Sequence, residues 1–342
     1  MTPSTQWKEN IDPGEAARLE KYAEALHAIQ KKRDSLGTVK RALHPKGHLG
    51  LKAEFTVLPD LPDYAKVGIF AKPGTFKAYV RFSNGGSTVD DDRKGGTRAI
   101  ALKLLGVGGK KIIPGLENAP TQDFLLIGAP ALPFKNADEF VPFVTNIGRP
   151  WIGLLTIIFK IGLGRTLAII KAATKGPKRP TISLATTRFY SAAPIQFGPY
   201  AVHYTLMPRA ANAPDAKPGQ TPNYLAEELS ARIKRESVTY DFGVQFFVDE
   251  TQTPIEDGSV EWKEDIAPFV TLGKLTVTPQ DPDSAPGRKL YEFIEKLSFD
   301  IWHAPEEFRP LGNIMRARRV AYKVSSKERR ALPEPDGSEK FE

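Results

Sequence analysis

The chain has 342 residues, of which 41% are hydrophobic and 26% are charged, a composition typical of a folded globular protein with a large core. Its formal net charge of +8 comes from basic residues spread along the sequence, so the charge gives no particular support to nucleic-acid binding. The absence of cysteine excludes disulfides, thiolate metal sites, iron–sulfur clusters and thiol catalysis.

The first residues are polar. Residues 1–12 contain no apolar run, so we expect a loosely ordered tail instead of a signal peptide, and a cytoplasmic protein. From residue 13 to residue 35, apolar side chains recur with the 3.6-residue period of a helix. This pattern predicts an amphipathic helix packed along the body of the protein.

Short apolar or alternating segments, separated by glycine and proline, predict a series of β-strands. They lie at residues 51–57, 76–83, 98–105, 124–127, 200–206, 240–248 and 272–277. So many short strands between Gly/Pro turns favour an antiparallel β-barrel. The predicted fold class is α+β, with a barrel core, an N-terminal helix and a helical C-terminal region.

Residues 151–170 form the most apolar part of the chain. Lys160 and Arg165 interrupt the segment and three glycines weaken it, so it does not match a membrane-spanning helix. We predict one or two amphipathic helices. Two interpretations remain open: a core or dimer helix, or a helix that contacts lipid at a membrane surface.

Further helices are predicted at residues 137–144, 224–236 and 289–297, and residues 331–342 are expected to be a second loosely ordered tail. No domain boundary is evident. We therefore predict a single domain over residues 1–342.

Few residues suggest a metal site. His44 and His48 are four residues apart, but Pro45 and Gly47 disfavour a helix there, so a zinc pair is a weak hypothesis. The acidic run at residues 90–92 is interpreted as a solvated turn. His44 is the best candidate for a general acid–base, because imidazole titrates near neutrality; the alternative is a surface turn histidine.

The basic C-terminal segment contains one tyrosine. Arg318 and Tyr322 are four residues apart, so they share one face of a helix. A guanidinium beside a phenol favours the phenolate, which is a suitable ligand for ferric iron. The alternative is a solvated basic helix.

Four motifs in this order resemble those of the catalase family. They are Arg41-x-x-His44-x-Lys-Gly47, Val80-Arg-Phe-Ser83, Arg98-Ala-Ile-Ala-Leu-Lys103 and Arg318-x-x-x-Tyr322. The surrounding sequence resembles that of small bacterial catalase-related haem peroxidases more than that of full-length catalases; the small proteins lack the C-terminal flavodoxin-like domain. Three positions depart from the family pattern. Ala99 and Ile100 follow Arg98 where the family has Gly-Phe, and Ser325 replaces a threonine.

The resemblance implies haem b as cofactor and assigns roles to individual residues. Tyr322 would be the iron ligand, with Arg318 stabilising its charge. His44 would be the catalytic acid–base, oriented by Ser83, and Asn118 would polarise the peroxide. The remaining cofactor contacts would come from Arg41, Arg81 and Arg329 at the haem propionates and from Phe134 beside the haem.

The implied function is reduction of hydrogen peroxide or organic hydroperoxides through a ferryl intermediate, with a small-molecule reductant. One alternative is fatty-acid hydroperoxide metabolism, as in the allene oxide synthases that resemble catalases. Leu43 counts against it, because those synthases carry threonine before the histidine. The other alternative is a non-enzymatic haem-binding or membrane-associated protein. We expect a homo-oligomer, with a dimer favoured.

Overall fold

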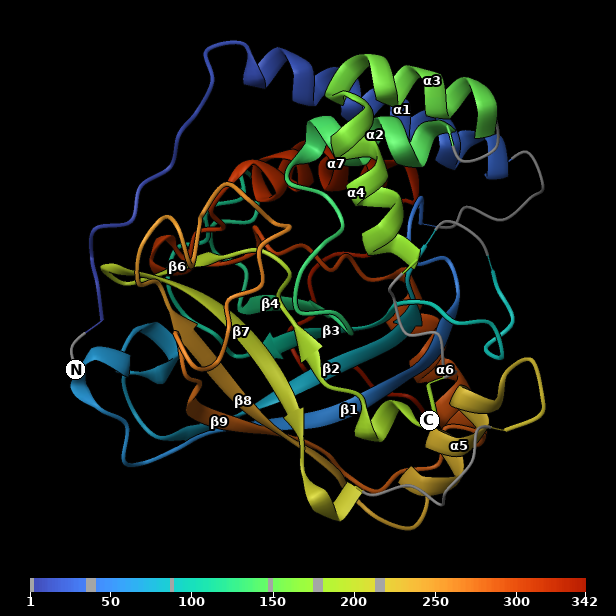
Figure 1. Ribbon diagram of the computed structural model, residues 1–342. Helices are drawn as coiled ribbons and strands as arrows, with labels where there is room; N and C mark the ends of the chain where they lie inside the picture. Colours follow the sequence, from blue (N-terminus) through green and yellow to red (C-terminus); the bar gives the residue numbers. More distant parts are fainter. Residues whose placement is uncertain (1–2, 35–40, 87–88, 147–149, 175–180, 213–218) are drawn as a thin grey trace.

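The structure is a computed structural model that describes residues 3–34, 41–86, 89–146, 150–174, 181–212 and 219–342 (Figure 1). Antiparallel strands form its centre. Their bounds are β1 (Gly47–Val57), β2 (Gly74–Asn84), β3 (Arg98–Leu105), β4 (Thr121–Ile127), β5 (Phe189–Tyr190), β6 (Ile195–Phe197), β7 (Tyr200–Pro208), β8 (Val238–Phe246) and β9 (Val270–Val277).

The strands close into a barrel. They pair in the order β5-β4-β3-β2-β1-β9-β8-β7, and β7 pairs back with β5, which closes a ring of eight strands. Strand β6 pairs with the beginning of β7, next to β5 on the same edge. This confirms the predicted α+β fold with an antiparallel barrel core.

The interior of the barrel is a packed aromatic core. Phe242 contacts Phe55 and Phe124 with ring centroids 5.2 and 5.3 Å apart, in edge-to-face arrangements. All three rings are buried. Because side chains alternate along a strand, Phe124 and Leu126 of β4 point into this core while Leu125 points to the other face.

The helices lie outside the barrel in two groups. Helices α1 (Glu15–Asp34), α2 (Ala137–Asn146), α3 (Pro150–Ile161), α4 (Leu163–Thr174) and α7 (Asn313–Glu328) gather on one side, at the top of Figure 1. Helices α5 (Tyr224–Ile233) and α6 (Ala285–Lys296) pack against β1 elsewhere. Short 3-10 helices occur at Asp63–Ala65, Gly68–Phe70, Leu184–Thr186, Ala210–Asn212 and Glu306–Phe308.

The apolar segment at residues 151–170 is divided between α3 and α4. Gly162 separates them with a φ of 82°, in the left-handed region that favours glycine. Its N–H donates to Ile158 O at 2.8 Å, and its carbonyl accepts from Thr166 N at 3.1 Å. Among the described residues, none of the helices combines the length and the apolar character that a membrane crossing requires.

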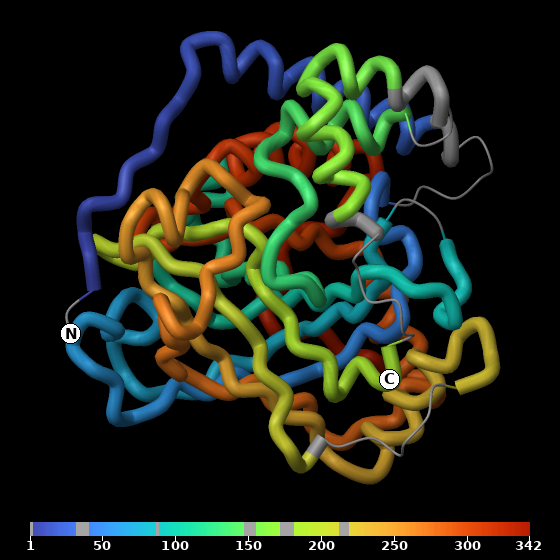
Figure 2. Tube along the Cα trace, viewed as in Figure 1, coloured from blue at the N-terminus to red at the C-terminus, as the bar shows by residue number. Residues whose placement is uncertain are grey.

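Both terminal segments make side-chain contacts with the body of the protein. Figure 2 traces the backbone of the N-terminal segment, in dark blue, upward from the N mark. Near the N-terminus, Trp7 Nε1 donates to Pro199 O at 2.9 Å, and Glu9 accepts a 2.7 Å bond from Arg309 Nη1. Near the C-terminus, Phe341 packs against Phe293 with ring centroids 5.3 Å apart. These contacts hold single residues of each segment, and the looseness of residues 1–12 and 331–342 stays a prediction. The single domain over residues 1–342 stays a prediction.

Candidate active site

A cavity of about 480 Å³ lies between the barrel and the helices α1, α2 and α7. Its volume falls within the range of about 300–1,000 Å³ that is usual for ligand pockets. Most of its lining is apolar and comes from β3, β4, α1, α2, α7 and the segments that connect these elements. These side chains include Leu26, Leu43, Ile100, Leu125, Leu132, Phe134, Phe140, Phe143, Phe299 and Ile314.

His44 lines this cavity from the segment that precedes β1. Its φ of 59° is uncommon for a residue other than glycine, and its N–H donates to Gly86 O at 2.8 Å. Ser83 Oγ lies 3.4 Å from His44 Nδ1, in the pairing that the sequence predicts. If Nδ1–H donates to Ser83, Nε2 is left as a proton acceptor.

The electrostatic surroundings keep the His44 imidazole neutral. Burial, together with the positive charges of Arg81, Arg318 and Arg41, lowers its pKa to about 3. The side chain is therefore a base without a proton at neutral pH. This is the state that can accept a proton from a substrate.

Three arginines converge beside the cavity. Arg41 and Arg81 both bind the carboxylate of Glu295, at 3.2 and 2.6 Å, and Arg81 Nη2 also donates to His44 O at 3.0 Å. Arg329 lies beside them. Burial, together with the positive charge of Arg81, lowers the pKa of Arg329 to about 10. One carboxylate thus faces three guanidinium groups.

Helix α7 contributes Arg318 and Tyr322 to the same cavity. They lie one turn apart, as predicted, together with Ser325 and Arg329 on the face that points toward the barrel. Arg318 Nη1 contacts Met315 Sδ at 3.7 Å. Burial raises the pKa of the nearby Tyr204 phenol, an effect that the charge of Arg318 opposes.

A comparison with protein-family models found no match. Among curated proteins, the chain is 28% identical over 311 residues to a catalase-related peroxidase of Mycolicibacterium paratuberculosis (strain ATCC BAA-968 / K-10); this covers 84% of the chain and 88% of that relative. Among solved structures, a bacterial catalase has a TM-score of 0.62 at 17% identity, covering 90% of this chain and 60% of that one.

Two further structures have the same fold. A fungal catalase has a TM-score of 0.62 at 15% identity, covering 87% of this chain and 62% of that one. Catalase A from Saccharomyces cerevisiae has a TM-score of 0.60 at 14% identity, covering 87% and 64%. The chain has the catalase fold. It spans less than two thirds of the length of these solved catalases.

In this catalase-like fold, all but one of the residues predicted for the site border one cavity. Besides those described above, Phe134 lines it and packs against Phe140 and Phe143, with ring centroids 5.3 and 5.1 Å away. Asn118 is the exception. It is exposed in the loop between β3 and β4 and does not line the cavity. The structure therefore does not bring Asn118 together with His44.

The sequence analysis missed Glu295 and the contribution of α1. Glu295 lies on the amphipathic helix α6, where a single acidic residue gives no signal of an arginine cluster. Helix α1 was expected to pack along the body, but His27 and Gln30 line the cavity. Gln30 is 1% exposed, and neither polar atom of its amide has a partner among the described residues.

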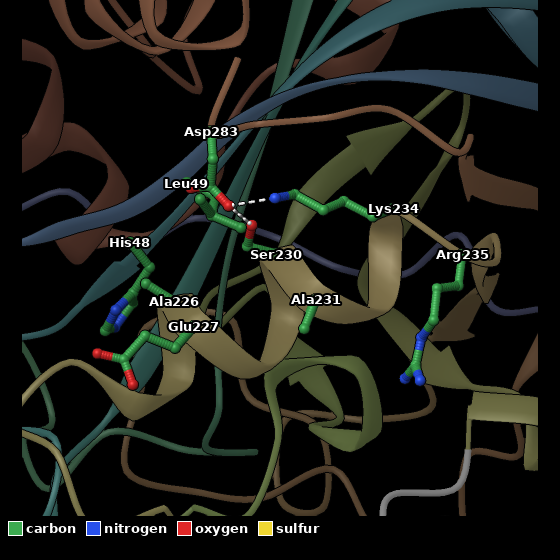
Figure 3. A pocket seen from close by; sticks show the side chains of 9 residues that line it. All are labelled: His48, Leu49, Ala226, Glu227, Ser230, Ala231, Lys234, Arg235 and Asp283. Atoms are coloured by element: carbon green, nitrogen blue, oxygen red, sulfur yellow. Dashed lines mark hydrogen bonds and ion pairs between the residues drawn. The ribbon is translucent and has the colours of Figure 1, made fainter.

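A second, shallow pocket lies between β1 and α5 (Figure 3). Its lining includes His48, one member of the candidate zinc pair, and none of the residues predicted to bind haem or to act in catalysis. The His48 imidazole is held by Asn84 at 2.7 Å and lies beside the carboxylate of Asp92. Asp92 is fully buried and pairs with Lys46 at 2.7 Å. The acidic run at residues 90–92 is therefore not simply a solvated turn, since its last member holds the β1–β2 end of the barrel together.

Proposed function

We propose that the protein is a haem-dependent peroxidase with catalase-like activity, which reduces hydrogen peroxide or organic hydroperoxides. The observation that carries the proposal is the convergence of His44, Ser83, Arg318 and Tyr322 on one apolar cavity, in a chain with the catalase fold. The relative named catalase-related peroxidase supports the same class of reaction.

The charges beside the cavity fit the anionic edge of haem b. Within the described part of the chain, Glu295 is the one carboxylate that Arg41, Arg81 and Arg329 face, which leaves an excess of two positive charges. Two propionate groups would balance that excess. In addition, Arg329 Nε is buried and has no hydrogen-bond partner within the described part of the chain, so a carboxylate there would satisfy it.

The rest of the cavity lining fits the macrocycle and the iron of haem b. Apolar side chains such as Phe134 and Ile100 suit a macrocycle, and the Tyr322 phenol is a donor that suits ferric iron. Haem b, when bound, supplies the redox-active iron, and Tyr322 would be its protein ligand.

His44 would move the proton. Its neutral Nε2 would accept a proton from the peroxide oxygen nearer the cofactor and return it to the other oxygen, so that the O–O bond breaks and that second oxygen leaves as water or as an alcohol. The first oxygen would leave as water after two electrons from the reductant and two protons are added. Ser83 keeps the ring in the orientation that this transfer needs. The net reaction consumes two electrons from a small-molecule reductant and two protons for each peroxide reduced.

The test compares haem-loaded parent protein with His44→Ala. We expect turnover of hydrogen peroxide to fall by about 10²–10⁴-fold, because general acid–base catalysis is worth that much, while the haem stays bound. Asn118→Ala is the matched control; because Asn118 lies outside the cavity, its turnover should equal that of the parent. Unchanged turnover in His44→Ala would refute the mechanism.

A further inference from the structure

Helices α3 and α4 expose an unusual amount of apolar surface. Among the described residues, ten large hydrophobic side chains are exposed, and five of them lie between residues 155 and 170. They are Leu155, Phe159, Leu163, Leu167 and Ile170, which we call the α3–α4 surface. The most exposed is Phe159, at 89%.

Helical periodicity gathers these side chains on one face of each helix. Leu155 and Phe159 are four residues apart on α3, whereas Ile157 between them is buried. On α4, Leu163, Leu167 and Ile170 follow the spacing i, i+4 and i+7. Each helix therefore has a buried face of its own and a second apolar face that meets solvent.

The inner face of α4 is fastened to α2. Arg165 donates to both carboxylate oxygens of Glu139, at 2.7 and 2.8 Å, and Thr166 and Ile169 are buried. Helix α2 supplies apolar lining to the cavity and packs against α3, and Figure 1 shows the helix pair at the outer side of this layer. The ion pair and the buried side chains hold the inner face of α4 against the protein, so the exposed side chains of the opposite face meet solvent.

The charged residues on α3 and α4 themselves have one sign. The sequence contains no aspartate or glutamate from Phe140 to Pro214, whereas it has nine lysines and arginines there. Lys160 and Lys171 are exposed on the two helices. Two helices that expose apolar side chains and lysines complement an anionic bilayer, where acyl chains take the apolar groups and headgroups attract the lysines.

We propose that the α3–α4 surface docks onto the face of an anionic lipid bilayer. Each helix has 12 residues, or about 18 Å at 1.5 Å per residue, which is shorter than the bilayer core of about 30 Å. The helices therefore lie at the interface and do not cross it. A second copy of the chain is a poorer occupant, because two surfaces of the same positive sign would repel each other.

The test is sedimentation of the full-length protein with vesicles of phosphatidylglycerol and phosphatidylcholine in equal parts, or of phosphatidylcholine alone. We expect the parent to bind the anionic vesicles and Phe159→Ser with Leu167→Ser to bind them about tenfold more weakly. Lys160→Gln with Lys171→Gln should weaken binding to the anionic vesicles by about tenfold but leave binding to neutral vesicles unchanged.

The matched control is Ile11→Ser with Val89→Ser, which removes two side chains of similar exposure elsewhere, at 61% and 59%. This control should bind like the parent. Hydrogen peroxide turnover should be equal in all variants, so that loss of docking is distinguished from failure of the proposed reaction. The proposal is overturned if the parent does not bind anionic vesicles, or if Phe159→Ser with Leu167→Ser changes the oligomeric state in sedimentation velocity instead of vesicle binding.

Discussion

The arrangement of single charges around the cavity explains why the protein can tolerate three arginines side by side. Burial and the guanidinium groups of Arg81 and Arg329 lower the pKa of Arg41 well below its usual range. Burial alone would raise the pKa of Glu295, but the charges of Arg81 and Arg41 outweigh burial, so its pKa is lowered and it stays ionised. Glu295 is therefore the counter-ion that holds the cluster together before any anionic group arrives.

Replacing Glu295 by glutamine tests this role. The haem-free protein should lose about 2 kcal/mol of unfolding free energy, because the buried arginines keep only their mutual repulsion. Haem loading should restore more stability in Glu295→Gln than in the parent, since propionates would replace the missing charge. Thermal unfolding of both proteins, with and without haem, measures the difference. Equal stabilisation by haem in the two proteins would show that the arginines do not hold an anionic edge.

Among the elements, the C-terminal segment after α7 is an unexpected part of the barrel wall. Lys103 of β3 is fully buried and donates to Asp123 of β4 at 2.6 Å and to Glu334 at 2.6 Å. Thr121 Oγ1 donates to Glu334 at 2.8 Å, and His303 Nδ1 lies 3.4 Å from it. Glu334 thus ties the last residues of the chain to the outer face of β3 and β4.

Glu334→Ala should therefore destabilise the protein by about 3 kcal/mol, because it leaves the buried Lys103 with one carboxylate instead of two. The free energy of unfolding in urea gives the value. Lys340→Ala, at an exposed position of the same segment, is the control and should change stability by less than about 0.5 kcal/mol. A loss below about 1 kcal/mol in Glu334→Ala would mean that the segment is held by its other contacts.

Element types were predictable wherever the apolar pattern was long. Strand β3 was predicted with its observed bounds, and the strong period of α1 placed that helix within two residues at its start. Strands β5 and β6 have two and three residues, too short for any alternation to be seen. Their pairing depends on the closure of the ring, which local sequence does not encode.

The site residues that could be predicted from the sequence are those that belong to a motif. His44, Ser83 and Tyr322 stand in recognisable patterns, and the fold brings them to one cavity. Glu295 and Gln30 became visible only through contacts across the fold, since neither belongs to a motif. Asn118 stands in a local match to the family pattern, but the loop between β3 and β4 leaves it outside the cavity.

For the whole molecule, buried histidines couple folding to pH. His203 lies in the packed region beside Trp262, with ring centroids 4.2 Å apart, and burial lowers its pKa from 6.5 to about 3. Between these two pH values the unfolded chain binds a proton that the folded protein does not. His203 therefore lowers the free energy of unfolding as the pH falls from 6.5 to about 3.

His203→Phe should remove this dependence while keeping an aromatic ring against Trp262. Within that pH range, the unfolding free energy of the parent should fall more steeply than that of the variant, by about 1.4 kcal/mol per pH unit. Urea unfolding at several pH values measures both slopes. Identical slopes would mean that His203 is protonated in the folded protein as readily as in the unfolded chain.

The measurement that tests the central proposal most directly is the absorption spectrum of the purified, haem-replete protein beside that of Tyr322→Phe. A phenolate ligand to the iron predicts a Soret band in the parent, and in the variant either loss of haem or a changed ferric spectrum, because phenylalanine offers no donor atom. Retention of the fold in the variant is checked by circular dichroism. No Soret band in the parent, or the same ferric spectrum in both proteins, would contradict the account.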